Sequence, residues 1–439
     1  MAKYIIAGGI PLYGSVRLGG AKNASFKLMI ASLLATGESR LLNFSHISDV
    51  YLTRDIIESL GGRVRSAGER TWFIDSTPLK SFVIDTKFGS GSRASSMFVG
   101  PLLHRFCKAV FPLPGGDKLG NRPLDRHFDS LKALGAQVKI MGSLCEVSCN
   151  KLHGAPYTFT KPSHTGTETL IMAAVLAAGK TTIYNAALEP EIDDLITFLN
   201  QMGAKIKRIR HRTIEVIGVS KLRPTIYKIM PDRNEAVSYA CAAIATKGDI
   251  IVENARAAHL EAFLDKLDAI GGGYDTGNFG VRFYYHQPIQ ATDIITSPHP
   301  GFMTDWQPLW AVLMTQAQGK SVIHEAVHPN RFQYVDGLVR MGAHIDTFNP
   351  PVSDPVKTYH FNLEDDRPEY HHAIRITGPT ALKAGDMDIP DLRAGATYVL
   401  AALVAQGQSI LNHIEHIERG YENLEQRLQA IGAKIKRTD

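Results

Sequence analysis

The sequence predicts two inside-out, barrel-like α/β domains, each made of three repeats of a strand–helix–strand–helix–strand–strand unit. The length of 439 residues is too great for one ordinary core and suits two domains. A short pattern, in which an apolar residue and a glycine precede a spacer and a second apolar residue, recurs at Gly61, Gly135, Gly203, Gly271, Gly342 and Gly432. These glycines are 74, 68, 68, 71 and 90 residues apart, so six similar units fill the chain.

Each unit contains a helix that is apolar nearly all round. These helices are expected at residues 22–36, 95–103, 167–178, 234–246, 307–316 and 393–406. A helix without a polar face has to be buried. Most of them end in a turn with glycine followed by β-branched residues, as at 179–183 and 319–323, which indicates a following strand. The three inner helices of each domain are therefore predicted to lie inside its sheets.

The repeated glycine follows a second, amphipathic helix, as residues 191–202 and 421–431 show. Glycine just beyond a periodic segment is typical of a helix C-cap, because it readily adopts the left-handed conformation. We expect this outer helix to end at the glycine and to lead into two strands.

The longest interval predicts an insertion around residues 349–370. Its Pro350-Pro351 pair and its acidic run at 364–366 are typical of a surface loop. His360, His371 and His372 lie close by, but without the fixed spacing of metal ligands. We interpret them as solvated loop histidines.

The composition is that of a globular protein, with 44% hydrophobic and 21% charged residues. No apolar stretch approaches the ~20 residues that span a bilayer. The first residues include too few apolar side chains for a secretory signal. We therefore expect a cytoplasmic location and no membrane partner. The formal charge of +5 comes without a basic run, which argues against a nucleic-acid partner. The four cysteines lack zinc-ligand spacing, so no metal site is expected.

Polar residues gather at the starts of the inner helices. If these helices run parallel, their N-termini open on one face of each domain, and two such faces would form a cleft that attracts anions. Capping explains Asn23 and Asp391. It does not explain Lys22, Arg93 and Arg393, because a cation is unfavourable at a helix N-terminus. These cations therefore indicate a bound anion.

A glycine-rich segment at residues 114–123 lies between two periodic stretches and is long enough to act as a lid. It is one of about a dozen short stretches, in order along nearly the whole chain, that resemble the enolpyruvyl transferases. They include Gly20-Ala21-Lys22-Asn23-Ala24, the loop 116–127, Pro231-Asp232-Arg233, Thr304-Asp305, Asn330-Arg331-Phe332, Asp391-Leu392-Arg393-Ala394 and Arg419-Gly420-Tyr421-Glu422.

The resemblance is to the branch of this family that uses UDP-N-acetylglucosamine. It implies phosphoenolpyruvate as the donor and neither a metal nor an organic cofactor. It also implies that the chain crosses twice between the domains. One domain is then predicted at residues 22–231, with a lid loop at 112–123, and the other at 1–21 and 232–439. The active site is expected in the cleft between them.

The same resemblance assigns roles to individual side chains. Lys22, Arg122 and Arg419 would hold the phosphate of phosphoenolpyruvate, while Arg331 and Arg393 would hold its carboxylate, since forked guanidinium groups suit planar oxyanions. Asp305 would draw the proton from the attacking hydroxyl, and Asp391 would help to shuttle a proton beside the reacting carbon. The residues that would contact the UDP-sugar are Asn23, Arg93, Pro123, Leu124, Asp125, Arg126, His127, Lys161, Ser163, Asp305 and Val327.

The sequence departs from the family at three places. Asp117 stands at the lid position where most members carry a cysteine, which the resemblance implies is the acid for C3 of phosphoenolpyruvate or for the departing phosphate. A carboxylic acid suits that task if burial raises its pKa from about 3.9. Arg126 replaces an apolar residue that covers the uracil, and His164-Thr165 replaces a small pair near the nucleotide. These departures, with the insertion, leave open a related enzyme that uses another nucleotide sugar.

Two other functions are alternatives to enolpyruvyl transfer to a nucleotide sugar. A shikimate 3-phosphate enolpyruvyl transferase would share the fold and the donor, but its Asn-Ser-Gly-Thr run is absent, and residues 91–95 read Gly-Ser-Arg-Ala-Ser. A ligand-binding protein without catalysis would not need Lys22, Asp305 and the arginines, which are all retained. We therefore predict enolpyruvyl transfer to UDP-N-acetylglucosamine, by addition of the sugar oxygen and elimination of phosphate.

Overall fold

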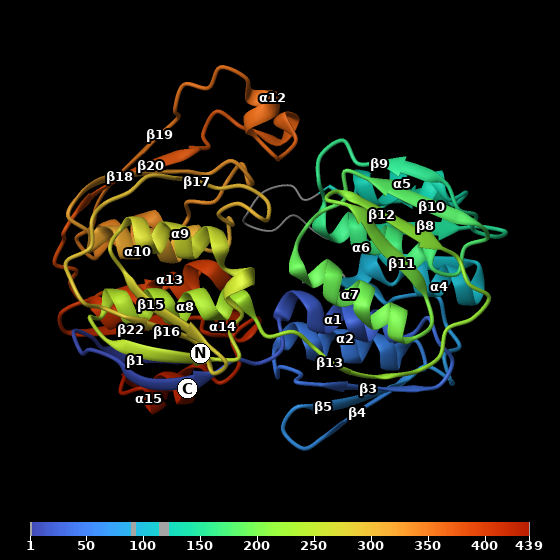
Figure 1. Ribbon diagram of the computed structural model, residues 1–439, viewed down its shortest axis with the longest axis horizontal. Coiled ribbons are helices and arrows are strands. Elements are labelled where there is room, and N and C mark those ends of the chain that lie inside the picture. The colour runs from blue at the N-terminus through green and yellow to red at the C-terminus, as the bar shows by residue number, and fades with distance from the viewer. Residues whose placement is uncertain (1, 89–93, 114–122, 439) are drawn as a thin grey trace. The chain divides into compact units, whose positions relative to one another are not determined.

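The computed structural model describes residues 2–88, 94–113 and 123–438 (Figure 1). These residues divide into two compact units, and the chain passes from one to the other after Leu18 and after Met230. We call residues 2–18 and 231–438 the terminal unit, and residues 19–88, 94–113 and 123–230 the central unit. The predicted lid loop 112–123 lies, apart from residues 112, 113 and 123, outside the described part of the chain.

The central unit has three sheets, with strand orders β13-β3-β5-β4, β6-β8-β7 and β11-β12-β10-β9. Their strands are β3 (Glu38–Leu42), β4 (Arg63–Ala67), β5 (Thr71–Asp75), β6 (Lys108–Pro112), β7 (Gln137–Met141), β8 (Leu144–Ser148), β9 (Pro156–Thr158), β10 (Lys180–Tyr184), β11 (Lys205–Arg210), β12 (Thr213–Ile217) and β13 (Ile226–Lys228).

The terminal unit also has three sheets, with orders β15-β16-β14-β2, β17-β18-β20-β19 and β21-β22-β1-β23. Their strands are β1 (Lys3–Ala7), β2 (Tyr13–Arg17), β14 (Asp249–Glu253), β15 (Gly273–Gly277), β16 (Gly280–Tyr284), β17 (Ile294–Ile295), β18 (Gly319–His324), β19 (His344–Phe348), β20 (Ala373–Gly378), β21 (Asp386–Asp388), β22 (Gln408–Asn412) and β23 (Lys434–Thr438).

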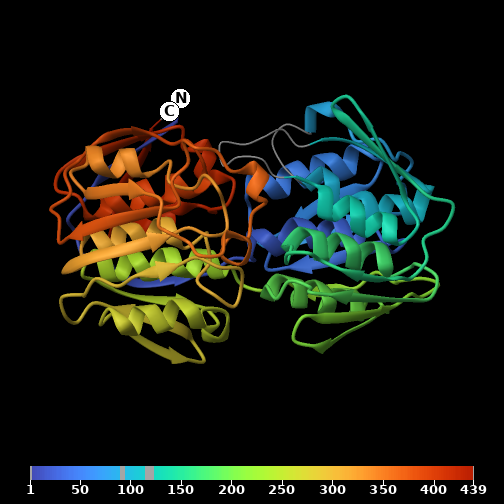
Figure 2. The same cartoon turned by 90° about the horizontal axis from the view of Figure 1, so that it is seen from above.

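Each crossing follows a strand that pairs within the unit that the chain is about to leave. β2 precedes the first inner helix of the central unit, but it pairs in parallel with β14 of the terminal unit. β13 precedes the first inner helix of the terminal unit, and it pairs in parallel with β3 of the central unit. The last sheet is completed by β1, which pairs antiparallel with β23 near the marked ends of the chain (Figure 2). Each unit thus holds three repeats, and the terminal unit is built from both ends of the chain.

The inner helices are buried, as predicted. They are α1 (Lys22–Ser32), α3 (Ala94–Met97), α4 (Val99–Phe106) and α6 (His164–Ala174) in the central unit, and α8 (Arg233–Ala245), α10 (Gln307–Thr315) and α13 (Leu392–Val404) in the terminal unit. All nine residues of α10 are buried. Figure 1 shows α8, α10 and α13 stacked between the sheet of β18 and β20 and the sheet of β1 and β22. The inside-out α/β fold is confirmed, and its described strands form separate sheets rather than one closed barrel.

The helix predicted at residues 95–103 is interrupted. The structure has α3, which ends at Met97, and α4, which begins at Val99. Pro101 has no N–H group to donate to the carbonyl of Met97, so a single continuous helix would lack that hydrogen bond. Gly100 allows the close packing of α4 on α6, since a Cβ atom at this position would lie 3.0 Å from the backbone of Met172.

The outer helices end at the repeated glycines, as predicted. These helices are α2 (Ser48–Ser59), α5 (Asp125–Ala133), α7 (Pro190–Gln201), α9 (Glu261–Ala269), α11 (Val335–Arg340) and α15 (Leu424–Ala430). All six glycines have positive φ angles, from +79° to +103°. Glycine recurs at this point of every repeat because a side chain disfavours that conformation.

The insertion is more than the surface loop predicted from its prolines and acidic residues. It lies between β19 and β20 and contains α12 (Pro355–Thr358) and the short 3₁₀ helix η3 (Leu363–Asp365). Tyr359 and Phe361 are buried in a small cluster with Ala326. His372 is also buried, and its Nε2 lies 3.0 Å from Asp366 Oδ2, so the prediction of a solvated histidine is wrong for His372. Aromatic side chains within the insertion supply a local core that the loop-like composition concealed.

The remaining short helices are η1 (Thr86–Phe88), η2 (Ala257–His259) and α14 (Glu415–Glu418). No helix in the described part of the chain is long and apolar enough to cross a membrane.

Candidate active site

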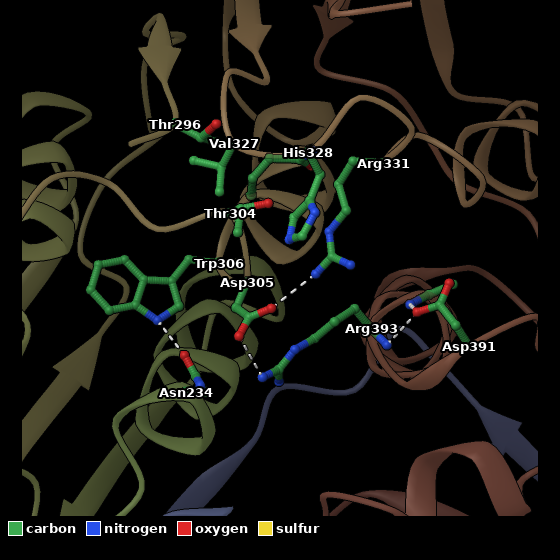
Figure 3. Close-up of polar contacts among 12 residues, drawn as sticks. Asn234, Thr296, Thr304, Asp305, Trp306, Val327, His328, Arg331, Asp391 and Arg393 are labelled. Carbon is green, nitrogen blue, oxygen red and sulfur yellow. Dashed lines mark hydrogen bonds and ion pairs between the residues drawn. The ribbon is translucent and has the colours of Figure 1, made fainter. Parts of the chain in front are cut away.

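The N-termini of the three inner helices of the terminal unit lie close together (Figure 3). Asn234, in the first turn of α8, accepts a hydrogen bond of 2.9 Å from the indole N–H of Trp306, which precedes α10. Asp305 pairs with Arg393, in the first turn of α13. The prediction that the inner helices begin on a common face is therefore confirmed in this unit.

Two arginines bind the carboxylate of Asp305 (Figure 3). Its Oδ1 accepts a hydrogen bond from Arg331 Nη2 at 2.9 Å, and its Oδ2 accepts one from Arg393 Nη2 at 3.0 Å. Burial disfavours the charged carboxylate, but Arg393 and Arg331 outweigh that effect and hold the pKa of Asp305 well below its usual range. Burial also opposes the charge of Arg393, yet Asp305 raises the pKa of that guanidinium. Asp305 and Arg393 therefore stabilise one another in their charged forms.

A buried glutamate holds the loop that leads toward Arg331. Glu325 Oε1 accepts hydrogen bonds from the backbone N–H groups of Val327, at 2.8 Å, and His328, at 3.0 Å. Its other carboxylate oxygen accepts a 2.9 Å bond from the hydroxyl of Thr304, the residue before Asp305. Glu325 was missed in the sequence, where the available signal was an acidic residue directly after an apolar strand.

Asp391 caps α13, as predicted from its position. One of its oxygens accepts hydrogen bonds from the backbone N–H groups of Arg393, at 2.7 Å, and Ala394, at 3.1 Å. On the other side of Arg393, the hydroxyl of Tyr421 lies 3.5 Å from Nη1 and 2.7 Å from the hydroxyl of Ser238. Tyr421 follows the predicted phosphate ligand Arg419 by two residues and was itself not predicted as a site residue.

In the central unit, Lys22 begins α1 and its Nζ lies 2.8 Å from Oδ2 of Asp49, in the first turn of α2. Asn23 follows Lys22 in the first turn and is half-buried. The sequence argument treated Lys22 and Arg393 as cations that need a bound anion. In the fold each already faces a protein carboxylate, so the cations alone do not require a ligand.

The residues predicted on the nucleotide side lie at the starts of α5 and α6. Asp125, Arg126 and His127 form the first turn of α5, and Pro123 and Leu124 precede it. Ser163 caps α6 by accepting a 3.2 Å hydrogen bond from the N–H of Gly166, and Lys161 lies just before this cap. His127 Nε2 lies 2.9 Å from the hydroxyl of Thr165. The fold thus brings these two helix starts into contact.

A buried group of charges lies beside Ser163. Lys27 Nζ is 2.5 Å from Glu168 Oε2 and 3.0 Å from His164 Nε2, and the same imidazole nitrogen is 3.2 Å from Glu168 Oε1. The Glu168 side chain is fully buried and that of Lys27 is 3% exposed. Burial disfavours the protonated imidazole, but Glu168 outweighs burial and raises the pKa of His164. The sequence pointed to His164 alone, because the pairing depends on how α1 and α6 pack.

Comparison with known proteins decides the family. Residues 6–428 match the family model described as EPSP synthase (3-phosphoshikimate 1-carboxyvinyltransferase). The chain is 41% identical over 433 residues to UDP-N-acetylglucosamine 1-carboxyvinyltransferase of Chlamydia trachomatis serovar D, covering 98% of this chain and 96% of that protein. It is 39% identical over 437 residues to the protein of the same name from Halothermothrix orenii, with 100% of both chains covered. The chain belongs to the enolpyruvyl transferase family.

Solved structures agree on the fold. The enolpyruvyl transferase NikO from Streptomyces tendae superimposes with a TM-score of 0.85 at 22% identity, covering 100% of this chain and 99% of that one. EPSP synthase from Acinetobacter baumannii superimposes with a TM-score of 0.71 at 17% identity, with 100% of both chains covered. At these identities the likeness extends to the architecture and not to the substrate.

In this enolpyruvyl transferase, Arg331 and Arg393 already hold one carboxylate, and their forked donors match any planar carboxylate of a substrate. No group of three or more His, Cys, Asp or Glu side chains is placed to hold a metal ion among the residues described. Arg93, Asp117 and Arg122 lie outside the described residues, and their roles stay predictions.

Proposed function

We propose that this protein transfers the enolpyruvyl group of phosphoenolpyruvate to the 3′-hydroxyl of UDP-N-acetylglucosamine and releases phosphate. The observation that carries the proposal is the Asp305 carboxylate between Arg331 and Arg393, where a base stands beside donors for a substrate carboxylate. The identity of 39–41% to curated relatives with this activity in their name, over 98–100% of the chain, supports the choice of acceptor.

The reaction needs one base, one acid and fixed cations. The sugar oxygen adds to C2 of phosphoenolpyruvate and gives its proton to Asp305, while C3 gains a proton from an acid, the role assigned to Asp117. Loss of phosphate and of a proton from C3 then restores the double bond, with Asp391 assisting the proton transfer. The charge that builds on the departing phosphate is stabilised by fixed cations, which usually make the largest contribution to such a step.

The donor's two anionic groups are assigned to different side chains. Arg331 and Arg393 hold the carboxylate, and Lys22, Arg122 and Arg419 hold the phosphate. On the acceptor side, Asn23 and Asp305 contact the sugar. Val327 is a further contact of the UDP-sugar. The nucleotide is assigned to Arg93, Pro123, Leu124, Asp125, Arg126, His127, Lys161 and Ser163. We also propose the cytoplasm as its location, since both substrates are intracellular metabolites.

A second candidate acceptor is a different nucleotide sugar. It is favoured by His164, which the Glu168–Lys27 pair holds at the start of α6 beside the nucleotide residue Ser163. An imidazole at this place adds both volume and charge near the proposed nucleotide site. It therefore supports a change of acceptor more directly than a change of donor.

Incubation with phosphoenolpyruvate and one acceptor at a time tests the proposal. UDP-N-acetylglucosamine should give equimolar phosphate and a product heavier by one enolpyruvyl group, as read by mass spectrometry. Shikimate 3-phosphate should give neither. Product with only another UDP-sugar would select the second candidate, and no phosphate with any acceptor would overturn the proposed function.

A further inference from the structure

Asp305 binds Arg331 and Arg393 in the way a substrate carboxylate would. Each carboxylate oxygen accepts one hydrogen bond from a different guanidinium, at 2.9 and 3.0 Å. The proposed function, on which this inference rests, assigns the same two donors to the carboxylate of phosphoenolpyruvate. One planar acceptor therefore already occupies the place that a second planar acceptor needs.

The site has more positive charge and more donors than Asp305 uses. Two guanidinium groups face one carboxylate, which leaves one positive charge uncompensated within the trio. The side chain of Arg331 is only 3% exposed, and its buried Nε has no hydrogen-bond partner in the described part of the chain. A buried donor without an acceptor is unfavourable, so this arrangement favours the arrival of another anion.

The guanidinium of Arg393 has a support that does not depend on Asp305. The hydroxyl of Tyr421 lies 3.5 Å from its Nη1, and this hydroxyl is itself anchored to Ser238 at 2.7 Å. Asp305 is the more accessible partner, because its side chain is 23% exposed while that of Arg393 is 11% exposed. An exchange of carboxylates would therefore move Asp305 and leave the arginine in place.

We propose that Asp305 occupies the carboxylate site of the donor in the ligand-free protein and that phosphoenolpyruvate displaces it. A carboxylate held by two guanidinium groups is a weak base, and displacement frees its oxygens to accept the proton of the acceptor hydroxyl. The donor thereby activates the base that its own reaction needs. In the absence of the donor, the base stays engaged by the two arginines.

Binding measurements on the whole protein test this exchange without turnover. Asp305→Asn keeps the shape of the side chain but removes its competing negative charge. Phosphoenolpyruvate should therefore bind this variant about tenfold or more tightly than it binds wild type, as measured by calorimetry. A hydrogen bond to a charged group contributes about that factor to an affinity. Asp305→Glu keeps the competitor and should show no such gain. Asp249→Asn, which breaks the Asp249–Arg282 pair on β14 and β16, is the matched control and should bind like wild type.

Inorganic phosphate is the second probe, because it lacks the carboxylate. Its affinity should change by less than threefold in Asp305→Asn. An equal gain for phosphate and phosphoenolpyruvate would overturn the exchange, since it would show only a general electrostatic effect. Unchanged phosphoenolpyruvate affinity in Asp305→Asn, in a variant that melts like wild type, would also overturn it. If wild type still releases phosphate in that case, the proposed function stands and only the exchange fails.

Discussion

Asp305 and Arg393 are 88 residues apart in the sequence, and their side chains are joined by a 3.0 Å ion pair between the starts of two inner helices. The pair exists because α10 and α13 pack side by side and begin on the same face of the terminal unit. It places the carboxylate that we propose as the base next to a guanidinium that we propose to hold a substrate carboxylate.

Asp305→Asn should lower the rate of phosphate release by about 10²–10⁴-fold, because loss of a general base costs about that much. The rate is measured by continuous phosphate detection at saturating substrates. Asp249→Asn removes a carboxylate from another arginine pair of the same unit and should retain the wild-type rate. Equal rates for Asp305→Asn and wild type would exclude Asp305 as the base.

Lys22→Ala should raise the KM for phosphoenolpyruvate and lower kcat, since the proposed cation binds the phosphate more strongly as it leaves. The loss is expected to be about 10²-fold or more in kcat/KM, which is typical of a removed electrostatic contact. Lys22→Arg keeps a positive charge and should recover part of the rate. Lys132→Ala, which breaks an exposed ion pair with Asp129, should leave both constants unchanged.

Lys27→Met should strongly destabilise the central unit. It leaves the fully buried Glu168 without its closest cation, and breaking a buried pair from one side costs about 3–5 kcal/mol in the free energy of unfolding. Lys27→Met/Glu168→Leu removes both charges and should regain most of that loss. Urea denaturation of Lys27→Met, Glu168→Leu and the double variant measures the coupling energy between the two side chains. Strictly additive losses would show that the two side chains do not stabilise one another.

The stability contributed by His164 should depend on pH. Its pKa is raised in the folded protein, so the contribution is fully present below the unfolded value of about 6.5 and is lost as the pH rises through the folded value. His164→Asn should therefore melt below wild type at pH 6, and the difference should shrink as the pH rises above neutrality. With Glu168→Gln as the background, this pH dependence should disappear. A difference in Tm that stays constant from pH 6 to pH 9 would contradict the effect of Glu168.

Asp117 should make the enzyme insensitive to the epoxide fosfomycin, which inactivates family members by alkylating the lid cysteine. A carboxylate is a poorer nucleophile toward an epoxide than a thiolate. Asp117→Cys should become alkylated in the presence of UDP-N-acetylglucosamine, and intact-mass spectrometry would detect the added mass. A covalent adduct on Asp117 of the wild-type protein, or none on the Cys variant, would contradict the predicted place of this residue at the reacting centre.

The repeated architecture could be predicted from the order of the residues alone. The six glycines predicted where the outer helices end, because the left-handed conformation at a helix C-cap favours glycine. The apolar inner helices predicted their own burial, since a helix without a polar face has no stable place at the surface. A dozen short stretches in family order predicted the family. These signals lie in short segments of the chain, and recognising them does not require knowledge of how the segments pack.

The tertiary structure decided which side chains meet. Asp305 with Arg331 and Arg393, Lys22 with Asp49, and Lys27 with Glu168 all depend on the packing of separate helices. The family resemblance predicted the two crossings of the chain, but the pairing of β2 with β14 and of β13 with β3 became visible only in the fold. Burial and pairing are properties of neighbours in space, so the charge state of Asp305 and the small core of the insertion emerged only when the repeats were assembled.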